Sequence, residues 1–223
     1  MKILEEVVGI EHGDASKVAS IFWDKNPIHP PVFPGTGLMA HAERMIRQTN
    51  RFQDRLNVGV NFAFLNLVYE GETVKFSRSG EGIVIKGMEG DVATFSLSKF
   101  SEIKFPKNGG YETVQRRFEL EPERLQEFYK FVKAQNQAQV YFIFPVASIV
   151  STFVSTVLNS LNQGEKIYLG RMDMNFSYQP TSSDLSTTIK FRQRSDGYLI
   201  YGRAEQEGRL ICEGKGLASK KTD

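Results

Sequence analysis

The fold of this chain is decided by a stretch that occurs twice. "VNFAFLNLVYEGETVKFSRSGEGIVIKG" runs from Val60 to Gly87, and "MNFSYQPTSSDLSTTIKFRQRSDGYLIYG" runs from Met174 to Gly202. Both contain an Asn-Phe pair, a β-branched run that ends in Lys-Phe, and a turn glycine, in the same order. Upstream, "VFPGTGLMAHAERMI" from Val32 matches "IFPVASIVSTFVSTV" from Ile143. A repeat of this length indicates that one structural unit has been duplicated.

The two copies account for nearly all of the 223 residues. We expect a first unit at residues 1–105 and a second at 111–219. Between them lies "IKFPKNGG" (Ile103 to Gly110), where a proline and a glycine pair interrupt the apolar pattern. The chain is therefore predicted to be a tandem of two related units.

Each unit has the same predicted order of elements. A short amphipathic helix comes first, at Ala15–Trp23 and Pro122–Lys133, and a second helix follows Pro34 or Pro145, since proline suits a first helical turn. Three or four strands with alternating or β-branched residues then follow. The predicted strands are residues 57–65, 73–78, 82–89, 92–100, 168–178, 186–193, 198–206 and 209–219.

The second helix of the second unit indicates the fold. "VASIVSTFVSTVLNSL" (Val146 to Leu161) is apolar on nearly all sides, which is typical of a helix buried within other elements. A buried helix wrapped by an antiparallel sheet is the outline of the hotdog fold. We therefore expect an α+β chain with a tandem (double) hotdog, a pseudo-dimer within one chain. The sequence leaves open whether two chains also form a homodimer.

Composition excludes several classes of function. Lys plus Arg number 28 and Asp plus Glu number 26, so the net charge of +2 gives no reason to expect a nucleic-acid partner. The single cysteine, Cys212, excludes an internal disulfide framework, and no ligand spacing for a metal is found. No cofactor is expected. The N-terminus lacks the apolar run of a signal peptide, and Val140–Leu161 carries too many polar residues for a membrane span, so we expect a cytoplasmic protein.

One polar segment resembles a known signature. "DKNPIH" (Asp24 to His29) resembles the D-x-N-P-x-H motif of the MaoC-like dehydratases, which include the (R)-specific enoyl-CoA hydratases. "GLMAHAERMI" (Gly37 to Ile46) resembles the G-x-I-A-H-G segment of that family, with Ala42 where a glycine usually stands. The resemblance covers mainly residues 15–76, and the equivalent segment of the second unit, residues 134–145, has no Asp and no His.

The resemblance implies a hydratase or dehydratase, a lyase of fatty acid metabolism that acts on a 2-enoyl or 3-hydroxyacyl thioester. The substrate would be carried by CoA or by an acyl carrier protein (ACP). Asp24 and His29 would jointly hold and activate a water molecule. The thioester carbonyl would accept from the N–H of Ala42, or from that of Thr36 or Gly37 if the helix begins earlier.

The residue types suit this chemistry. An Asp and a His five positions apart on an Asn-Pro turn can point to one spot, and Pro27 stiffens that turn. Histidine titrates near neutral pH, so it can both accept and return a proton. Asn26 and His41 complete the substrate-binding candidates, although His41 is expected to pack near the helix start.

Two features depart from that family. Only "PPVFPGT" separates His29 from Gly37, and this run resembles the H-x-P-x-x-P-G segment of the β-hydroxyacyl-ACP dehydratases. Those enzymes carry a helical Glu, but Glu43 does not match its spacing. The charges of Glu43, Arg44 and Arg47 also predict that the C-terminal half of this helix projects beyond the sheet or meets a partner.

The second unit is expected to shape the substrate tunnel. The acyl chain would run between the two central helices, lined partly by Phe144, Val146, Ile149 and Phe153. Three hypotheses remain open at this point: a hydratase or dehydratase, a hotdog thioesterase in which Asp24 activates water against the thioester carbonyl, and a non-catalytic acyl-binding hotdog protein. The sequence does not decide the acyl chain length, the carrier or the direction of reaction.

Overall fold

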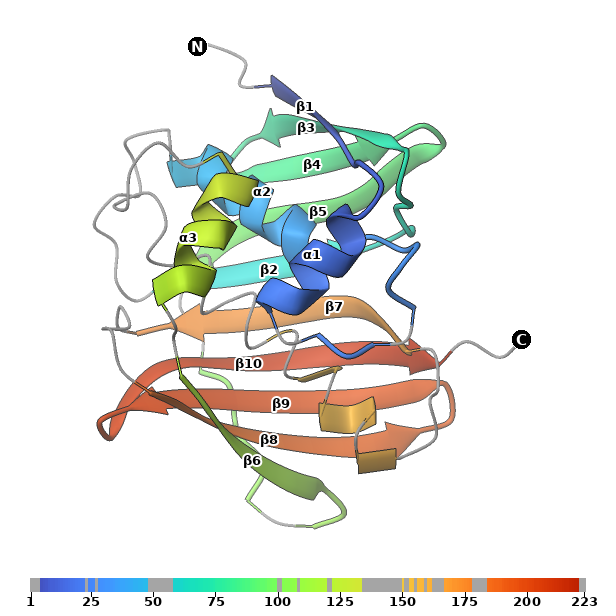
Figure 1. The fold of residues 1–223 in the computed structure, drawn as a ribbon. Helices are drawn as coiled ribbons and strands as arrows, with labels where there is room; N and C mark the ends of the chain where they lie inside the picture. The colour runs from blue at the N-terminus through green and yellow to red at the C-terminus, as the bar shows by residue number, and fades with distance from the viewer. Residues whose placement is uncertain are drawn as a thin grey trace.

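The computed structural model of the chain describes residues 5–22, 24–26, 28–47, 58–99, 102–107, 109–119, 122–133, 150, 153–154, 156–158, 160–161, 167–177 and 184–220. Within these residues, ten strands form one continuous antiparallel sheet (Figure 1). Three helices lie against the half of the sheet that the N-terminal strands form.

All eight predicted strands are present, and the structure adds two that the sequence analysis missed. The missed strands, β1 and β6, form the two edges of the sheet. The first five strands are β1 (Glu5–Gly9), β2 (Val58–Phe64), β3 (Thr73–Ser79), β4 (Gly82–Gly87) and β5 (Gly90–Lys99). The last five are β6 (Glu112–Phe118), β7 (Ile167–Phe176), β8 (Leu185–Arg194), β9 (Gly197–Gln206) and β10 (Arg209–Lys220).

The strand order shows the duplication directly. The sheet runs β1-β3-β4-β5-β2-β7-β10-β9-β8-β6, so the order in one half mirrors the order in the other. Strands β2 and β7 meet at the centre, and Val60 pairs with Met174, the residue that the repeat aligns with it. Two equivalent residues that face each other mark a local two-fold relation between the halves. This arrangement is the expected double hotdog.

The helices occupy the places that the sequence predicts, with shifted ends. They are α1 (Asp14–Ile21), α2 (Gly35–Arg47) and α3 (Pro122–Phe131), and Figure 1 shows α1 and α3 lying in front of α2. Residues 150, 153–154, 156–158 and 160–161 of the second central helix are also helical, and those from 150 to 158 are buried. No helix in the described ranges is long and apolar enough to cross a membrane.

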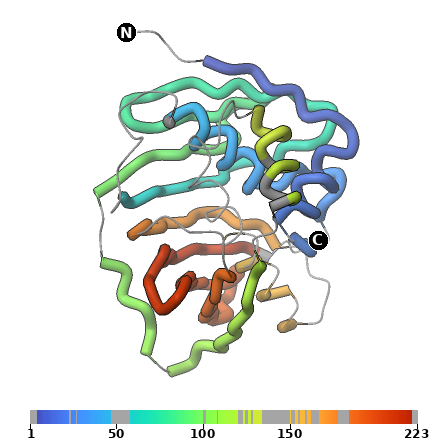
Figure 2. Tube along the Cα trace, turned by 60° about the vertical axis from the view of Figure 1, so that its left-hand side comes forward, coloured from blue at the N-terminus to red at the C-terminus, as the bar shows by residue number. Residues whose placement is uncertain are grey.

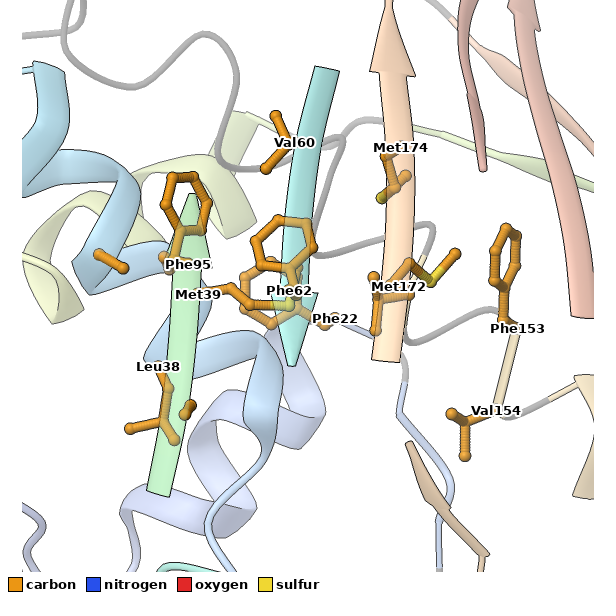
Figure 3. Packing of buried hydrophobic residues seen from close by; sticks show 14 of the residues in the cluster. Phe22, Leu38, Met39, Val60, Phe62, Phe95, Phe153, Val154, Met172 and Met174 are labelled. Carbon is orange, nitrogen blue, oxygen red and sulfur yellow. The ribbon is translucent and has the colours of Figure 1, made fainter. Parts of the chain in front are cut away.

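One hydrophobic core runs through both halves of the molecule. Phe62 of β2 pairs with Met172 of β7, and both side chains are buried. Figure 3 shows this pair between Met39 of α2 on one side and Phe153 of the second helix on the other. The apolar faces of the two central helices therefore share one buried layer, which the sheet closes from behind.

The link between the halves runs outside the second half of the sheet. Figure 2 shows the chain descending from the end of β5 to β6 at the far edge. Phe105 and Tyr111 from this link pack edge-on against Tyr201 of β9, with ring centroids 6.4 and 5.7 Å apart. Because neighbouring side chains on a strand alternate and Ile200 is buried, Tyr201 faces away from the core.

The prediction that the end of α2 projects from the sheet is wrong. Glu43 and Arg44 are buried, with 7% and 5% of their surface exposed. Arg44 forms an ion pair with Glu6 on the edge strand β1. Because β1 is not among the strands predicted from the sequence, its contact with Arg44 could not be foreseen. The side chain of Arg47 lies outside the described residues.

Candidate functional site

Asp24 is fixed where α1 gives way to the following loop. Its backbone N–H donates to the carbonyl of Ala19, 2.8 Å away, which extends the last turn of α1. Its carboxylate Oδ1 accepts from the N–H of Asn26 at 2.9 Å. An Asp side chain that accepts from the backbone two residues later forms a compact turn. Both bonds hold the second carboxylate oxygen, Oδ2, in a defined place.

Asn26 ties this loop to the other half of the protein. Its side-chain Nδ2 donates to the carbonyl of Ile167 on β7 at 2.7 Å, and its Oδ1 accepts from the N–H of Ile28 at 3.2 Å. The residue is 5% exposed, so both bonds are shielded from water. Asn26 is therefore in place to position the loop, and its amide already has partners on both sides.

The structure brings Asp24 and His29 together. His29 Nε2 lies 3.6 Å from Asp24 Oδ2, and each side chain is 6% exposed. On the other side of the ring, His29 Nδ1 bonds to the carbonyl oxygen of Val32. A carbonyl can only accept, so Nδ1 carries a proton. In the neutral imidazole, Nε2 then presents a lone pair towards the carboxylate.

These two side chains stand in the wall of a cavity of about 70 Å³. The other lining residues are mostly apolar and come from the start of α2, the β2–β3 connection, the second central helix and the start of β7. They are Asn26, Ile28, Val32, Phe33, Gly35, Thr36, Leu38, Phe64, Asn66, Leu67, Val68, Val150, Val154, Ile167, Tyr168 and Leu169. A small apolar cavity with a few convergent polar groups is the usual form of a ligand site.

The start of α2 decides between the alternative carbonyl donors. The helix begins at Gly35, so Ala42 lies well inside it, where helical N–H groups are bonded to the carbonyl four residues earlier. The expected N–H donor at Ala42 is therefore not available. Gly37 is excluded as well, because its N–H donates to Pro34 at 2.9 Å. Of the three candidates, only Thr36 lines the cavity.

The two glycines at this helix start are there for packing. A Cβ on Gly37 would lie 2.5 Å from the ring of Phe33, and one on Gly35 would lie 2.6 Å from the ring of Phe64. Real Cβ atoms do not approach a ring so closely. Gly35 therefore lets α2 begin directly against Phe64, a residue that also lines the cavity.

His41 does not contact this cavity. Its ring packs against Phe76 and Phe131, with ring centroids 5.7 and 5.3 Å away. Burial lowers the pKa of His41 to about 3, and the positive charges of Arg44 and Lys133 act in the same direction. Its Nδ1 has no hydrogen-bond partner in the described part of the chain. The expectation that it packs near the helix describes it better than a substrate-binding role.

The second central helix contributes Val150 and Val154 to the cavity, and neither was among the residues expected. Phe144, Val146 and Ile149 lie outside the described residues. Phe153 is buried, but its ring lies against Gly202 of β9, where an added Cβ would come within 1.6 Å of it. Of the described residues of this helix, Val150 and Val154 line the cavity. Their spacing of four residues is the sequence signal that could have identified them, because such residues share one helix face.

Comparison with known proteins shows similarity of structure but not of sequence. No family model and no curated protein matches the chain. The 12:0-ACP thioesterase of Umbellularia californica has a TM-score of 0.60 and 10% identity, covering 98% of this chain and 94% of its own. A MaoC-like dehydratase of Phytophthora capsici has a TM-score of 0.57 and 11% identity, with 99% and 96% covered. A Mycobacterium tuberculosis protein described as a double hotdog has a TM-score of 0.63 and 9% identity, with 99% and 96% covered.

These similarities establish the fold. The chain is a double hotdog, aligned over almost its full length with structures of the same architecture. The neighbours include both a thioesterase and a dehydratase, so the fold is shared by enzymes with different chemistry. The reaction has to be inferred from the site itself.

Proposed function

We propose that this chain hydrates a 2-enoyl thioester, or dehydrates the corresponding 3-hydroxyacyl thioester. The observation that carries the proposal is the Asp24–His29 pair, 3.6 Å apart in the wall of an apolar cavity. Hydration of a double bond needs a group that activates water and a group that delivers a proton, both on one face of the substrate. The resemblance of residues 24–29 to the MaoC-like signature supports the same assignment.

The hydrogen bonds of the pair suit a water molecule. The ionised carboxylate Oδ2 of Asp24 accepts only, and in the neutral imidazole of His29, with its proton on Nδ1 at Val32, Nε2 also accepts. Two acceptors facing each other favour a donor between them. A water beside both atoms can donate one hydrogen to each, which leaves its oxygen lone pairs free to attack.

The atoms of the reaction then balance. The water oxygen bonds to the β-carbon of the enoyl group while the Asp24–His29 pair takes one of its protons. The electron pair of the double bond moves towards the thioester carbonyl, which becomes enolate-like. The pair returns a proton to the α-carbon on the same face, giving the 3-hydroxyacyl product. The positive end of the α2 dipole, at Gly35 and Thr36, stabilises the developing oxyanion.

The rest of the cavity suits the acyl chain. Its apolar walls come from both halves, with Val32 and Leu38 from the first and Val150, Val154 and Ile167 from the second. Such a wall binds an alkyl chain by removing apolar surface from water. We also propose that the functional units are residues 1–105 and 111–219, with CoA or ACP held outside the cavity mouth.

The test is a spectrophotometric assay with crotonyl-CoA. Wild-type protein should lower the absorbance of the enone band as water adds to the double bond. Asp24→Asn and His29→Gln should each lower kcat at least about 100-fold, the scale of general acid–base catalysis. His12→Gln is the matched control, because His12 is a histidine whose side chain is 88% exposed. Full activity in Asp24→Asn would rule out the proposed chemistry.

A thioesterase is the second candidate, favoured by the similarity in fold to the 12:0-ACP thioesterase across 98% of this chain. In that case Asp24 would activate water against the carbonyl carbon, and the thiol would leave. A thiol-reactive dye in the same assay separates the two reactions. Release of CoA from saturated acyl-CoA, without any loss of the enone band from crotonyl-CoA, would favour the thioesterase.

A further inference from the structure

Thr36 holds a buried hydroxyl that the proposed chemistry has not yet used. The residue is 3% exposed and lines the same cavity as Asp24 and His29. Its Oγ1 has no hydrogen-bond partner within the described residues. Leaving a buried polar group unpaired is unfavourable, so an unpaired one in a cavity wall calls for a physical reason.

We infer that the Thr36 hydroxyl is a catalytic donor to the thioester carbonyl oxygen of the substrate. The inference rests on the proposed function and adds a specific residue to it. A hydroxyl can rotate its hydrogen towards an acceptor that arrives with the ligand. The carbonyl oxygen of an acyl thioester is such an acceptor, and it becomes a stronger one as negative charge develops during the reaction.

Thr36 carries the side-chain hydroxyl at this end of α2. The N–H of Gly37 is already bonded to Pro34, and Gly35 has no side chain to offer. Thr36 lies in the first turn of α2, where the helix dipole favours negative charge. Its hydroxyl and its backbone N–H can therefore act on the same oxygen, while the Asp24–His29 pair works on the water.

The aligned residue of the second half supports a role in chemistry over one in the fold. The repeat aligns Val32 with Ile143, so Ala147 is the residue of the second half that aligns with Thr36. The second unit therefore has no hydroxyl at the aligned position. The hydroxyl accompanies Asp24 and His29, which the second half also lacks.

The test compares Thr36→Val with Thr36→Ser. Valine keeps the shape and loses the hydroxyl, so kcat for crotonyl-CoA hydration should fall about 100-fold, and KM should rise about tenfold because one hydrogen bond to the bound substrate is lost. Serine keeps the hydroxyl and should restore kcat to within about tenfold of wild type. Thr36→Val should also keep or raise Tm, because it removes an unpaired buried hydroxyl. A Tm loss in Thr36→Val together with no recovery in Thr36→Ser would mark a structural residue and overturn the inference.

A binding measurement separates this inference from the proposed function. Hexanoyl-CoA, which has no double bond to hydrate, is titrated calorimetrically into Asp24→Asn and into Asp24→Asn with Thr36→Val. We expect Kd to be about tenfold weaker without the hydroxyl, the change for one lost hydrogen bond. An unchanged Kd and kcat overturns the role of Thr36 even if the wild type hydrates crotonyl-CoA. A weakened Kd supports it even if the wild type proves inactive in hydration.

Discussion

The two halves of this chain have the same strand order, but their sequences differ at Gly35-Thr36 and the residues aligned with them. The repeat aligns Gly35-Thr36 of the first half with Val146-Ala147 of the second, and it aligns Glu43 with Val154. The first half places its polar residues at the helix start. The second half is apolar there in sequence, and its Val154 lines the cavity of the first. One half therefore carries the polar residues of the candidate site, while the other supplies part of its apolar wall.

The halves are not independent, because the site depends on contacts between them. Asn26, which lies in the turn between Asp24 and His29, donates to the carbonyl of Ile167 on β7. The cavity takes Val150, Val154 and Ile167 from the second half. A hydrogen bond to a backbone carbonyl needs no particular side chain from the partner, so the second half can change its sequence without losing this contact.

The largest effect is expected when Gly35 is replaced by valine, the residue that the second half has at the aligned position, Val146. In Gly35→Val, the new Cβ would lie 2.6 Å from the ring of Phe64, which has to move into the cavity it lines. We expect hydration to be lost and the free energy of unfolding to fall by about 3 kcal/mol, the upper end for an overpacked site. Urea unfolding and the crotonyl-CoA assay measure both effects.

A second substitution checks the cause of this loss. Phe64→Leu in the Gly35→Val background removes the ring atoms that the valine meets, so it should recover part of the stability. If the double variant is less stable than Gly35→Val by the full cost of Phe64→Leu alone, the two side chains do not interact, and this explanation of Gly35 is wrong.

The next comparison concerns His41, which the repeat aligns with Thr152. The folded-state pKa of His41 is lowered from 6.5 to about 3, so below pH 6.5 the unfolded chain binds a proton that the folded chain does not. Stability is therefore full at neutral pH and falls as the pH drops through this window. A lowering of this kind corresponds to a loss of about 2 kcal/mol between pH 7 and pH 5.

His41→Thr should remove this loss. The difference in unfolding free energy between variant and wild type, followed by urea denaturation from pH 7 to pH 5, should shift by about 2 kcal/mol in favour of the variant. A difference that is constant with pH would show that His41 titrates alike in both states.

Much of this architecture could be predicted from the sequence. The repeat gives the double hotdog, because Asn61-Phe62 and Asn175-Phe176 recur in the same strand context and end up on the adjacent strands β2 and β7. The edge strands β1 and β6 could not be predicted in the same way. Their residues are mostly exposed or only partly buried, so they lack the strong apolar pattern of central strands.

The polar part of the candidate site was easier to predict than its walls. Asp24 and His29 are only five positions apart, so one turn can bring them together. The helix start was harder to place. Gly37 fits the MaoC-like segment and Gly35 fits the H-x-P-x-x-P-G run, and packing against Phe33 and Phe64 explains why both are glycines. Such contacts join residues far apart in the chain and leave no periodic signal.

The wall from the second half offers a smaller effect on substrate choice. Val154 lines the cavity, so Val154→Phe should fill part of it and disfavour longer acyl chains. We expect the ratio of kcat/KM for hexenoyl-CoA to that for crotonyl-CoA to fall about tenfold, the scale of one or two methylenes. Val7→Phe, at a residue 64% exposed, is the control and should leave the ratio unchanged. An equal fall for both substrates would mean that Val154 supports the fold without sensing chain length.

The smallest expected change in unfolding free energy comes from the first turns of α1 and α3, the first helix of each unit. The N–H groups of Gly13 and Ala15 at the start of α1 donate to Glu70 Oε1 at 3.0 and 2.9 Å, whereas α3 begins with Pro122, which has no N–H to satisfy. Glu70→Ala should cost about 1 kcal/mol in urea unfolding, the usual cost of a lost helix cap. Glu70→Gln keeps an acceptor oxygen and should retain most of this energy. Glu123→Ala, in the exposed first turn of α3, should cost only about 0.3 kcal/mol, because it removes a dipole interaction alone. Equal costs at Glu70 and Glu123 would mean that the two helices are held in the same way after all.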